Sequence, residues 1–236
     1  ADSLFVGNSA GDASDLMIRN TAASDLVTVR NNSFFDGATD DVGNPSGEWK
    51  GGSVVIESSN VLFENNLVAG HDASEGSWGV LLPTTYPTTQ INNNLIIGGS
   101  SGDGGGGIQL AWNPTNPLPG EIVGNIVASG SGSGIVSQGS SLPASTDYNN
   151  AWDNSVADFS TLSSVLSTPL ASISADPLFA AWSDDGDWTN DDFSLLLGSP
   201  SIDSGHPSVP GLDLDGSPTD QGIFGGPSGD WMPATP

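Results

Sequence analysis

One asparagine recurs at the same place in five copies of a short segment, and this repeat limits how the chain can fold. The copies align without internal gaps and begin at Val27, Val61, Thr89, Glu121 and Ser145. The repeated asparagines, 25 to 34 residues apart, are Asn32, Asn66, Asn94, Asn125 and Asn150. A repeat of this length is typical of a solenoid, in which each unit buries its apolar face only by stacking on the next.

A second apolar pattern precedes each later copy. It aligns residues at spacings of 26, 28 and 27, namely Val54, Val80, Ile108 and Ile135. Each unit is therefore expected to hold two short strands, whose side chains alternate between the inside and the outside and whose coils stack about 4.8 Å apart. The sequence predicts an all-β fold, a right-handed parallel β-helix of about five coils.

The repeated asparagine has a physical reason to lie at a bend between two strands. Asparagine can adopt left-handed backbone angles there and bond through its amide to the asparagine of the neighbouring coil. The five asparagines are thus predicted to form a structural ladder rather than a catalytic site. A β-sandwich also has short strands and turns, but it would not repeat the same residue at the same bend.

We expect residues 1–170 to form the β-helix and residues 171–236 an irregular acidic tail packed on the last coil. The tail is rich in proline, glycine, aspartate and tryptophan and has little strand periodicity. The stretch from Phe159 to Leu166 is expected to form a helical turn or two. The expected buried anchors of the tail include Phe179 and Phe193. Residues 1–15 show no amphipathic helix that would cover the other end. The N-terminal edge is therefore either masked by a loop, removed from a longer parent chain, or used to contact another molecule.

Charge excludes two classes of partner. The chain has 28 acidic and 3 basic residues and a net charge of −25, so it lacks the clustered cations that bind nucleic acid or anionic membranes. No apolar run is long enough for membrane insertion. Cysteine is absent, so disulfides do not stabilise the chain.

The repeats resemble the right-handed β-helices of secreted bacterial proteins, the large group that includes pectate-lyase-like folds. Three tail segments resemble the tail that commonly follows these helices in predicted surface proteins: ADPLF from Ala175, DFSLLLGSPSIDSG from Asp192 and DLDGSPTDQGIFGG from Asp213. The resemblance implies an extracellular or cell-surface protein.

Carboxylates near the predicted turns are candidate calcium ligands, because calcium takes several oxygen ligands. The candidates are Asp40, Asp41, Asp72 and Asp103 in loops between strands, and Asp213, Asp215 and Asp220 in the tail. The alternative is that these are solvated turn residues, which is the ordinary position of loop acids. Calcium is the only cofactor expected.

The resemblance also implies a possible enzyme, a calcium-dependent polysaccharide lyase, epimerase or hydrolase. Its site would lie at the loop edge and use His71, Asp72, Glu75 and Lys50. The pattern of paired aspartates with Gly-His-Gly that marks polygalacturonase-type hydrolases is absent. The scarcity of catalytic bases favours instead a non-enzymatic structural or surface protein that self-associates through its coil ends into a homo-oligomer or filament.

A third hypothesis is a carbohydrate-binding module that holds polysaccharide without chemistry. Aromatic rings near the turns would stack on sugars, and the candidates are Trp49, Trp78 and Trp112. Covering the core is an equally good role for these rings. Arg30 aligns with Glu64 and Asn92 and is interpreted as a surface charge or an ion-pair partner.

Overall fold

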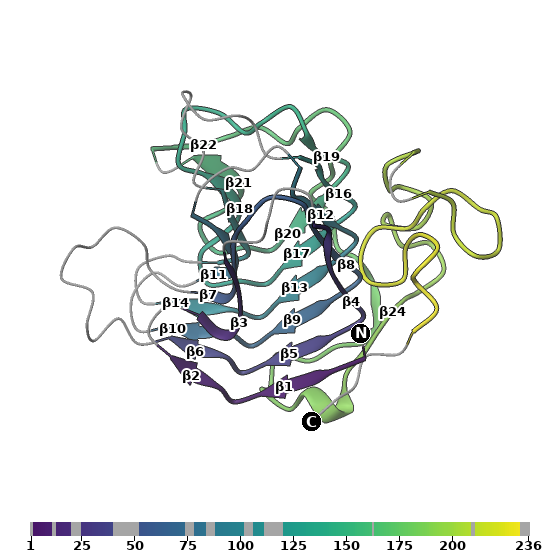
Figure 1. Cartoon of the computed structure of the whole chain (residues 1–236). Helices are drawn as coiled ribbons and strands as arrows, with labels where there is room; N and C mark the ends of the chain where they lie inside the picture. Colours follow the sequence, from purple (N-terminus) through teal and green to yellow (C-terminus); the bar gives the residue numbers. More distant parts are fainter. Residues whose placement is uncertain are drawn as a thin grey trace.

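A parallel β-solenoid with an irregular tail along its side makes up the chain (Figure 1). The computed structural model describes residues 2–10, 13–19, 25–39, 52–73, 78–83, 88–101, 106–110, 120–161, 163–208 and 211–231. These ranges contain no α-helix, and their one helical turn is the 3-10 segment η1 (Trp188–Asn190). No helix in them is long and apolar enough to cross a bilayer. The predicted all-β, parallel-coil fold class is confirmed.

Four sheets run along the solenoid and are here named A to D. Sheet A consists of β1 (Leu4–Val6), β5 (Ser33–Phe35), β9 (Leu67–Ala69), β13 (Leu95–Ile97), β17 (Ile126–Ala128) and β20 (Asn150–Trp152). Sheet B is short and consists of β2 (Ser9–Ala10), β6 (Ala38–Thr39), β10 (Asp72–Ala73) and β14 (Ser100–Ser101).

Sheet C consists of β3 (Ala13–Arg19), β7 (Gly52–Glu57), β11 (Trp78–Leu82), β15 (Ile108–Leu110), β18 (Ser133–Ser137) and β21 (Ala157–Thr161), followed by the antiparallel β22 (Ser164–Val165). Sheet D consists of β4 (Val27–Arg30), β8 (Val61–Glu64), β12 (Gln90–Asn92), β16 (Ile122–Val123) and β19 (Thr146–Asp147). In the tail, β23 (Phe179–Ala181) pairs with β24 (Asp192–Leu195). The helical turn expected at Phe159 to Leu166 is wrong, because β21 and β22 occupy this stretch as strands.

Each complete turn contributes one strand to every sheet, so a turn has four strands and not the two that the repeat predicted. Four turns are complete, and two incomplete rungs follow that lack a strand in sheet B. The expected five coils are therefore slightly too many. The predicted register between coils is confirmed in sheet C, where Val80 lies opposite Val54 and Ile108.

The core is a narrow apolar file inside the coils. Inward-facing residues of neighbouring turns stack on one another, and Phe5, Phe34 and Phe63 form a run of stacked rings with centroids 4.8 and 6.3 Å apart. Phe34 and Phe63 are fully buried. Burying such a side chain contributes about 1.5 to 3 kcal/mol, so the apolar core contributes substantially to the cohesion between turns.

A ladder of asparagine amides runs beside this core at the bend between sheets D and A. Each side-chain nitrogen donates to the Oδ1 of the next turn, over 3.0 Å from Asn32 to Asn66, 3.1 Å from Asn66 to Asn94 and 2.9 Å from Asn94 to Asn125. The same Oδ1 atoms accept backbone N–H groups at 3.0 to 3.1 Å. The ladder begins at the Ser3 backbone N–H and ends at the Ser172 hydroxyl.

The last rung of the ladder corrects the gap-free alignment. Asn125 bonds to Asn149 over 2.9 Å, and not to Asn150 as predicted. Ile122 lies opposite Thr146, so this copy of the repeat is offset by one residue from the others. Asn150 instead starts β20, and its side chain bonds to the tail.

The left-handed backbone angles belong to the residue before each ladder asparagine, which also differs from the prediction. This column has φ between 51° and 70° and consists of Asn31, Asn65, Asn93, Gly124 and Tyr148. Its side chains turn away from the ladder, and two of them bind the tail. Asn65 donates to the carbonyl oxygens of Ile223 and Gly225, and Asn93 donates to that of Asp220.

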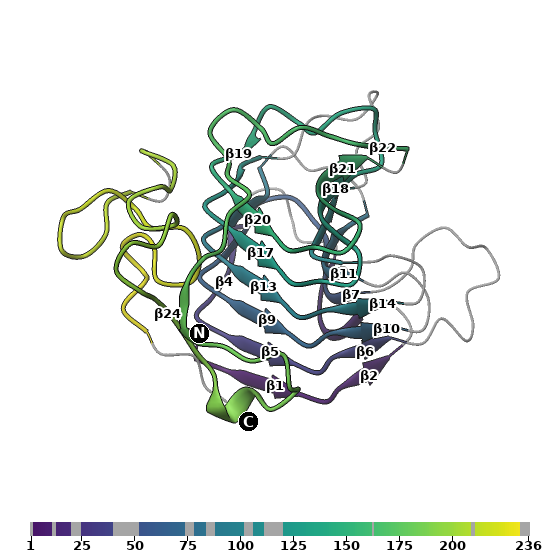
Figure 2. The same cartoon turned by 180° about the vertical axis from the view of Figure 1, so that it is seen from behind.

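The tail therefore lies lengthwise along the outside of the solenoid, and not only on the last coil as expected (Figure 2). Residues 171–173 do continue the last rung, where Ile173 bridges to Asn150. Beyond them the tail buries Trp188 and the predicted anchor Phe193 on the outer face of sheet A. Trp188 donates from Nε1 to Asp36 over 2.8 Å.

Two glycines make room for this tryptophan. At Gly70 and Gly98 a Cβ atom would lie 2.5 and 3.0 Å from the Trp188 ring, and both residues have φ near 65°. Side chains at these two bends would push the tail away from sheet A. Gly70 and Gly98, at the bend between sheets A and B, thus determine where the tail can dock.

Removing the side-chain amide of a ladder asparagine is expected to lower stability much more than removing the amide of the residue just before it in the chain. Asn94→Ala would remove the acceptor of the buried Asn66 backbone N–H and the donor to the carbonyl oxygens of Phe63 and Asn92, and we expect the free energy of unfolding to fall by at least about 3 kcal/mol. Asn93→Gly keeps the left-handed bend and removes one bond to the tail, for about 1 kcal/mol. Urea denaturation of both variants measures the difference, and equal losses would contradict the structural role of the ladder.

Candidate functional site

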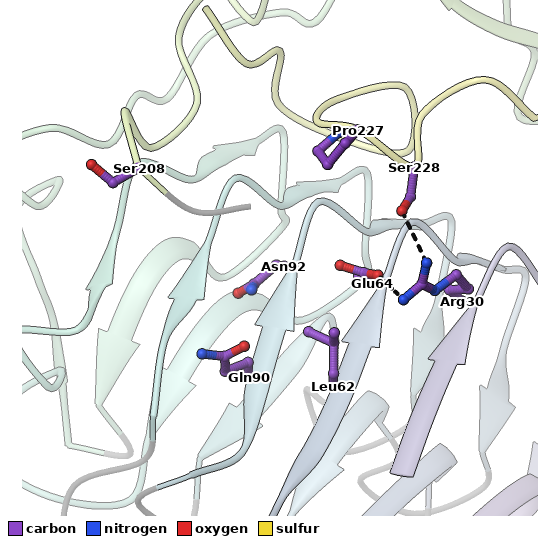
Figure 3. A pocket seen from close by; sticks show the side chains of 8 residues that line it. All are labelled: Arg30, Leu62, Glu64, Gln90, Asn92, Ser208, Pro227 and Ser228. Atoms are coloured by element: carbon purple, nitrogen blue, oxygen red, sulfur yellow. Dashed lines mark hydrogen bonds and ion pairs between the residues drawn. The ribbon is translucent and has the colours of Figure 1, made fainter. Parts of the chain in front are cut away.

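An open groove lies between the outer face of sheet D and the tail, and it encloses about 390 Å³ (Figure 3). Sheet D contributes one wall, with Arg30, Leu62, Glu64, Gln90 and Asn92. The tail contributes the other wall, with Ser208, Pro227 and Ser228. The wall from sheet D follows from strand register, because Arg30, Glu64 and Asn92 lie opposite one another on three successive turns.

An ion pair closes one end of the groove. Arg30 Nη2 lies 3.1 Å from Glu64 Oε1, and Arg30 Nη1 donates to the Ser228 hydroxyl over 3.4 Å, as Figure 3 shows. The Glu64 side chain is only 6% exposed. Burial raises the pKa of Glu64, and the Arg30 charge opposes this rise in part. The two charges largely neutralise each other and link sheet D to the tail.

Two amides form the middle of the same wall. Gln90 donates from Nε2 to Glu121 Oε2 over 3.2 Å. Asn92, with its amide oriented to satisfy both atoms, donates to the backbone oxygens of Ile91 and Glu121 at 3.1 and 3.3 Å. These bonds fix both amides in place. Asn92 is only 1% exposed, so of the two amides mainly that of Gln90 faces the groove. Sequence analysis found the column through Arg30 but not the groove, because its other wall is irregular tail.

Both ends of the solenoid have apolar side chains that are not fully buried. At the first turn, four inward-facing core residues are only partly buried: Phe5, Leu16, Val27 and Val29. We call this set the head face. The exposed Leu26 comes directly before Val27 of this set.

At the other end a pocket of about 360 Å³ lies over the last rung. Its lining is mainly apolar, from Leu142, Pro143, Ala144, Leu166, Pro169 and Leu170, and it also includes the polar residues Thr146, Asp147 and Ser167. We call it the end pocket. Leu170 at its rim is fully exposed.

Of the four predicted catalytic residues, His71 is buried and Asp72 is exposed. His71 is 1% exposed, and its Nε2 lies 2.9 Å from the Gly106 carbonyl oxygen. Its ring fills the space that the absence of a Cβ leaves at Gly99. Desolvation lowers the pKa of His71 to about 4, so the imidazole is neutral at pH 7. Asp72 is exposed and accepts a bond from Ser100 Oγ, while Lys50 and Glu75 lie outside the described residues.

The tail aspartates proposed as calcium ligands bond to the chain itself. Asp213 accepts the backbone N–H groups of Asp220 and Gly226, and Asp220 accepts that of Asp203. Asp215 accepts from Ser217. Burial raises the pKa of Asp220 to about 6, with the neighbouring carboxylates adding to the rise. In the part of the chain that the structure describes, no group of three or more His, Cys, Asp or Glu side chains could hold a metal ion.

The remaining candidates, the tryptophans and the other loop aspartates, are either buried or outside the described residues. Trp78 is 6% exposed and packs with Val55, Leu81 and Val136, which makes it part of a small core on sheet C. It is therefore core cover and not a platform for sugar stacking. Five candidates lie outside the described residues: Asp40, Asp41, Asp103, Trp49 and Trp112.

Comparisons with known proteins give no family. No family model matches the chain, and no match was found among curated proteins or solved structures. The function is therefore inferred from the residues of this chain.

The pKa values of His71 and Asp220 predict opposing effects of pH on stability. Below pH 6.5 the unfolded chain protonates His71, but the folded chain does so only near pH 4, so this group removes up to about 3 kcal/mol of stability between these values. Asp220 protonates near pH 6 in the folded chain and near 3.8 in the unfolded chain, so it adds stability as the pH falls.

Two variants separate these contributions. Asp220→Asn should make the loss of stability between pH 6.5 and 4 steeper than in the unchanged protein, and His71→Gln should make it shallower. Urea denaturation at a series of pH values measures both slopes. A His71→Gln slope equal to that of the unchanged protein would contradict burial of a neutral imidazole.

Proposed function

We propose that the protein is a non-enzymatic structural protein of the cell surface or the extracellular space, whose solenoids associate head to tail. The observation that carries this proposal is the incomplete burial of the head face. Phe5 and Leu16 are partly exposed, whereas the residues opposite them one turn further, Phe34 and Val54, are at most 1% exposed. Covering such apolar surface is favourable by roughly 25 cal/mol per Å².

The end pocket supplies an apolar surface of a different shape at the opposite end. A head face that packs against the end pocket of another copy leaves one free surface at each end of the pair. Contacts of this heterologous kind extend into a filament unless the rotation between copies closes a ring. Leu166 and Leu170 of one copy would then cover the head face of the next.

Strand pairing between copies is less favourable than side-chain packing. At the head, β1, β2 and β4 have 3, 2 and 4 residues, and β3 has an irregular register between Ala13 and Leu16. Asp15 lies within this irregularity, bonded to Asn8. Short, bulged and charged edge strands are features that oppose edge-to-edge pairing. At the far end, β21 is already paired with β22.

The non-enzymatic part of the proposal is supported by the state of the candidate bases. His71 is buried and neutral at pH 7, and His206 lies edge-on to Tyr148 with ring centroids 4.8 Å apart. In the groove, Glu64 is engaged by Arg30. A lyase or epimerase near Asp72 would need a base there. Of the two candidates, His71 does not reach solvent and Lys50 lies outside the described residues.

Secretion and kinship with bacterial β-helix surface proteins are further parts of the proposal. They are supported by the repeats and by the three tail segments from Ala175, Asp192 and Asp213. Calcium binding stays a prediction for the loop and tail aspartates.

Exposed leucines provide a matched test of association. Leu170 at the end pocket and Leu197 in the tail are both fully exposed, so either can be replaced at little cost to folding. We expect the unchanged protein to form concentration-dependent oligomers in sedimentation velocity experiments. Leu170→Ser should weaken them by about tenfold or more, whereas Leu197→Ser should leave them unchanged.

Mixing two variants tests the head-to-tail direction. Leu26→Ser alters the head and Leu170→Ser alters the end pocket, so each variant alone should be mostly monomeric. An equimolar mixture should form dimers, because one intact head face meets one intact end pocket. A monomeric unchanged protein at high concentration, or a mixture no more associated than its components, would overturn the proposal.

A further inference from the structure

We infer that copies of the chain stack in register, so that the bend between sheets C and D at the head of one copy lies on the end pocket of the next, and that Arg19 pairs with Asp147 across this contact. The inference rests on the proposed head-to-tail association. It adds the rotation between copies and the charged contact that fixes this rotation. Apolar packing alone determines neither, because it is not directional.

An exposed leucine and an arginine lie at the bend between sheets C and D on the first turn. There β3 ends at Arg19 and β4 begins at Val27. Leu26 comes directly before β4 and is 67% exposed. This bend therefore offers another copy an apolar side chain with a positive charge on the other side of the turn.

The end pocket lies at the same bend at the opposite end of the solenoid. Residues 142–144 of its lining come between β18 of sheet C and β19 of sheet D, and Leu166 and Leu170 follow β22 of sheet C. Figure 1 shows β19 and β22 at the end opposite β1. Successive turns stack bend over bend, so a second copy that continues the solenoid axis places its Leu26 over this pocket.

The end pocket also holds a carboxylate in a fixed position. Asp147 lines the pocket from β19 and is partly buried. Its Oδ1 accepts the backbone N–H groups of Tyr148 and Ala171 over 2.9 and 3.0 Å and the Ser172 hydroxyl over 3.2 Å. A mainly apolar pocket with one placed carboxylate suits an apolar side chain next to a cation.

Arg19 is the cation at the matching bend. The basic side chains in the part of the chain that the structure describes are Arg19 and Arg30, and both lie on the first turn. Arg30 is held at the groove by the buried Glu64 and by Ser228. Arg19 pairs with Glu57, and these side chains are 46% and 25% exposed. Exposed pairs contribute little to folding, so Arg19 can also bind a carboxylate of another copy.

An ion pair between copies selects one rotation about the solenoid axis, because charged contacts fix the register of an interface. Any other rotation separates Arg19 from Asp147. It also leaves only repulsion between copies that each have a net charge of −25. In-register stacking adds almost no rotation at each copy, so the assembly is an open filament and not a ring.

Neutralising Asp147 tests the pairing through the sign of the effect. Asp147→Asn keeps an oxygen for the three hydrogen bonds and should weaken association about fivefold in sedimentation velocity experiments, the effect of one lost ion pair. Asp153→Asn makes the same change directly after β20 of sheet A, where asparagine tolerates the φ of 55°. This control should leave association unchanged or slightly stronger, because it only lowers the repulsion between copies.

A double variant tests whether the two residues act together. Arg19→Gln should also weaken association about fivefold, and Arg19→Gln with Asp147→Asn should be no weaker than either single variant, because both changes remove the same pair. Melting temperatures equal to that of the unchanged protein show that the variants fold. Electron micrographs of the unchanged protein at high concentration should show unbranched rods.

Two kinds of result separate this inference from the association on which it rests. In-register pairing is overturned, and head-to-tail association stands, if Leu170→Ser weakens association but Asp147→Asn does not, if the losses of the two single variants add, or if the micrographs show closed rings. An unchanged protein that stays monomeric overturns both.

Discussion

The buried ladder of asparagine amides is the interaction on which the rest of the structure depends. At the bend between sheets D and A the backbone turns inside the protein, where unpaired peptide groups would be costly. The Asn94 side chain satisfies such groups, because it accepts the backbone N–H of Asn66 and donates to the carbonyl oxygens of Phe63 and Asn92. Because the same bonds repeat from turn to turn, they hold each coil in one register relative to its neighbour. This register aligns the inward-facing apolar side chains of successive coils.

The residue before each ladder position connects this constraint to the candidate site. Its left-handed conformation points its side chain outward, where Asn65 and Asn93 hold the tail by three hydrogen bonds. A tail fixed at these positions overhangs sheet D and forms the second wall of the groove. Trp188 secures the tail on sheet A, and Gly70 and Gly98 leave the room it needs. The bends thus determine both the shape of the solenoid and the place of its groove.

The sequence predicted what repeats and failed where the chain is irregular. The register of Val54 with Val80, the ladder from Asn32 to Asn125 and the partnership of Arg30 with Glu64 follow from columns of similar residues. The ladder position in the fifth copy was predicted wrongly, because Asn149 and Asn150 are adjacent and only the strand pairing between turns distinguishes them. The path of the tail could not be predicted, since its contacts join residues without any repeat. The burial of His71 depends on glycines from neighbouring turns, which no local pattern shows.

Charge favours contact between copies at the ends of the solenoid over contact at its sides. The tail that covers sheet A exposes Asp184, Asp185 and Asp187, so two solenoids that approach side by side meet like charges. The head face is apolar and the end pocket mainly so, and the proposed association there would avoid most of this repulsion. End-to-end packing leaves the sides of each solenoid in solvent. The groove lies on such a side, so an assembly of this kind would leave one groove per copy exposed along its length.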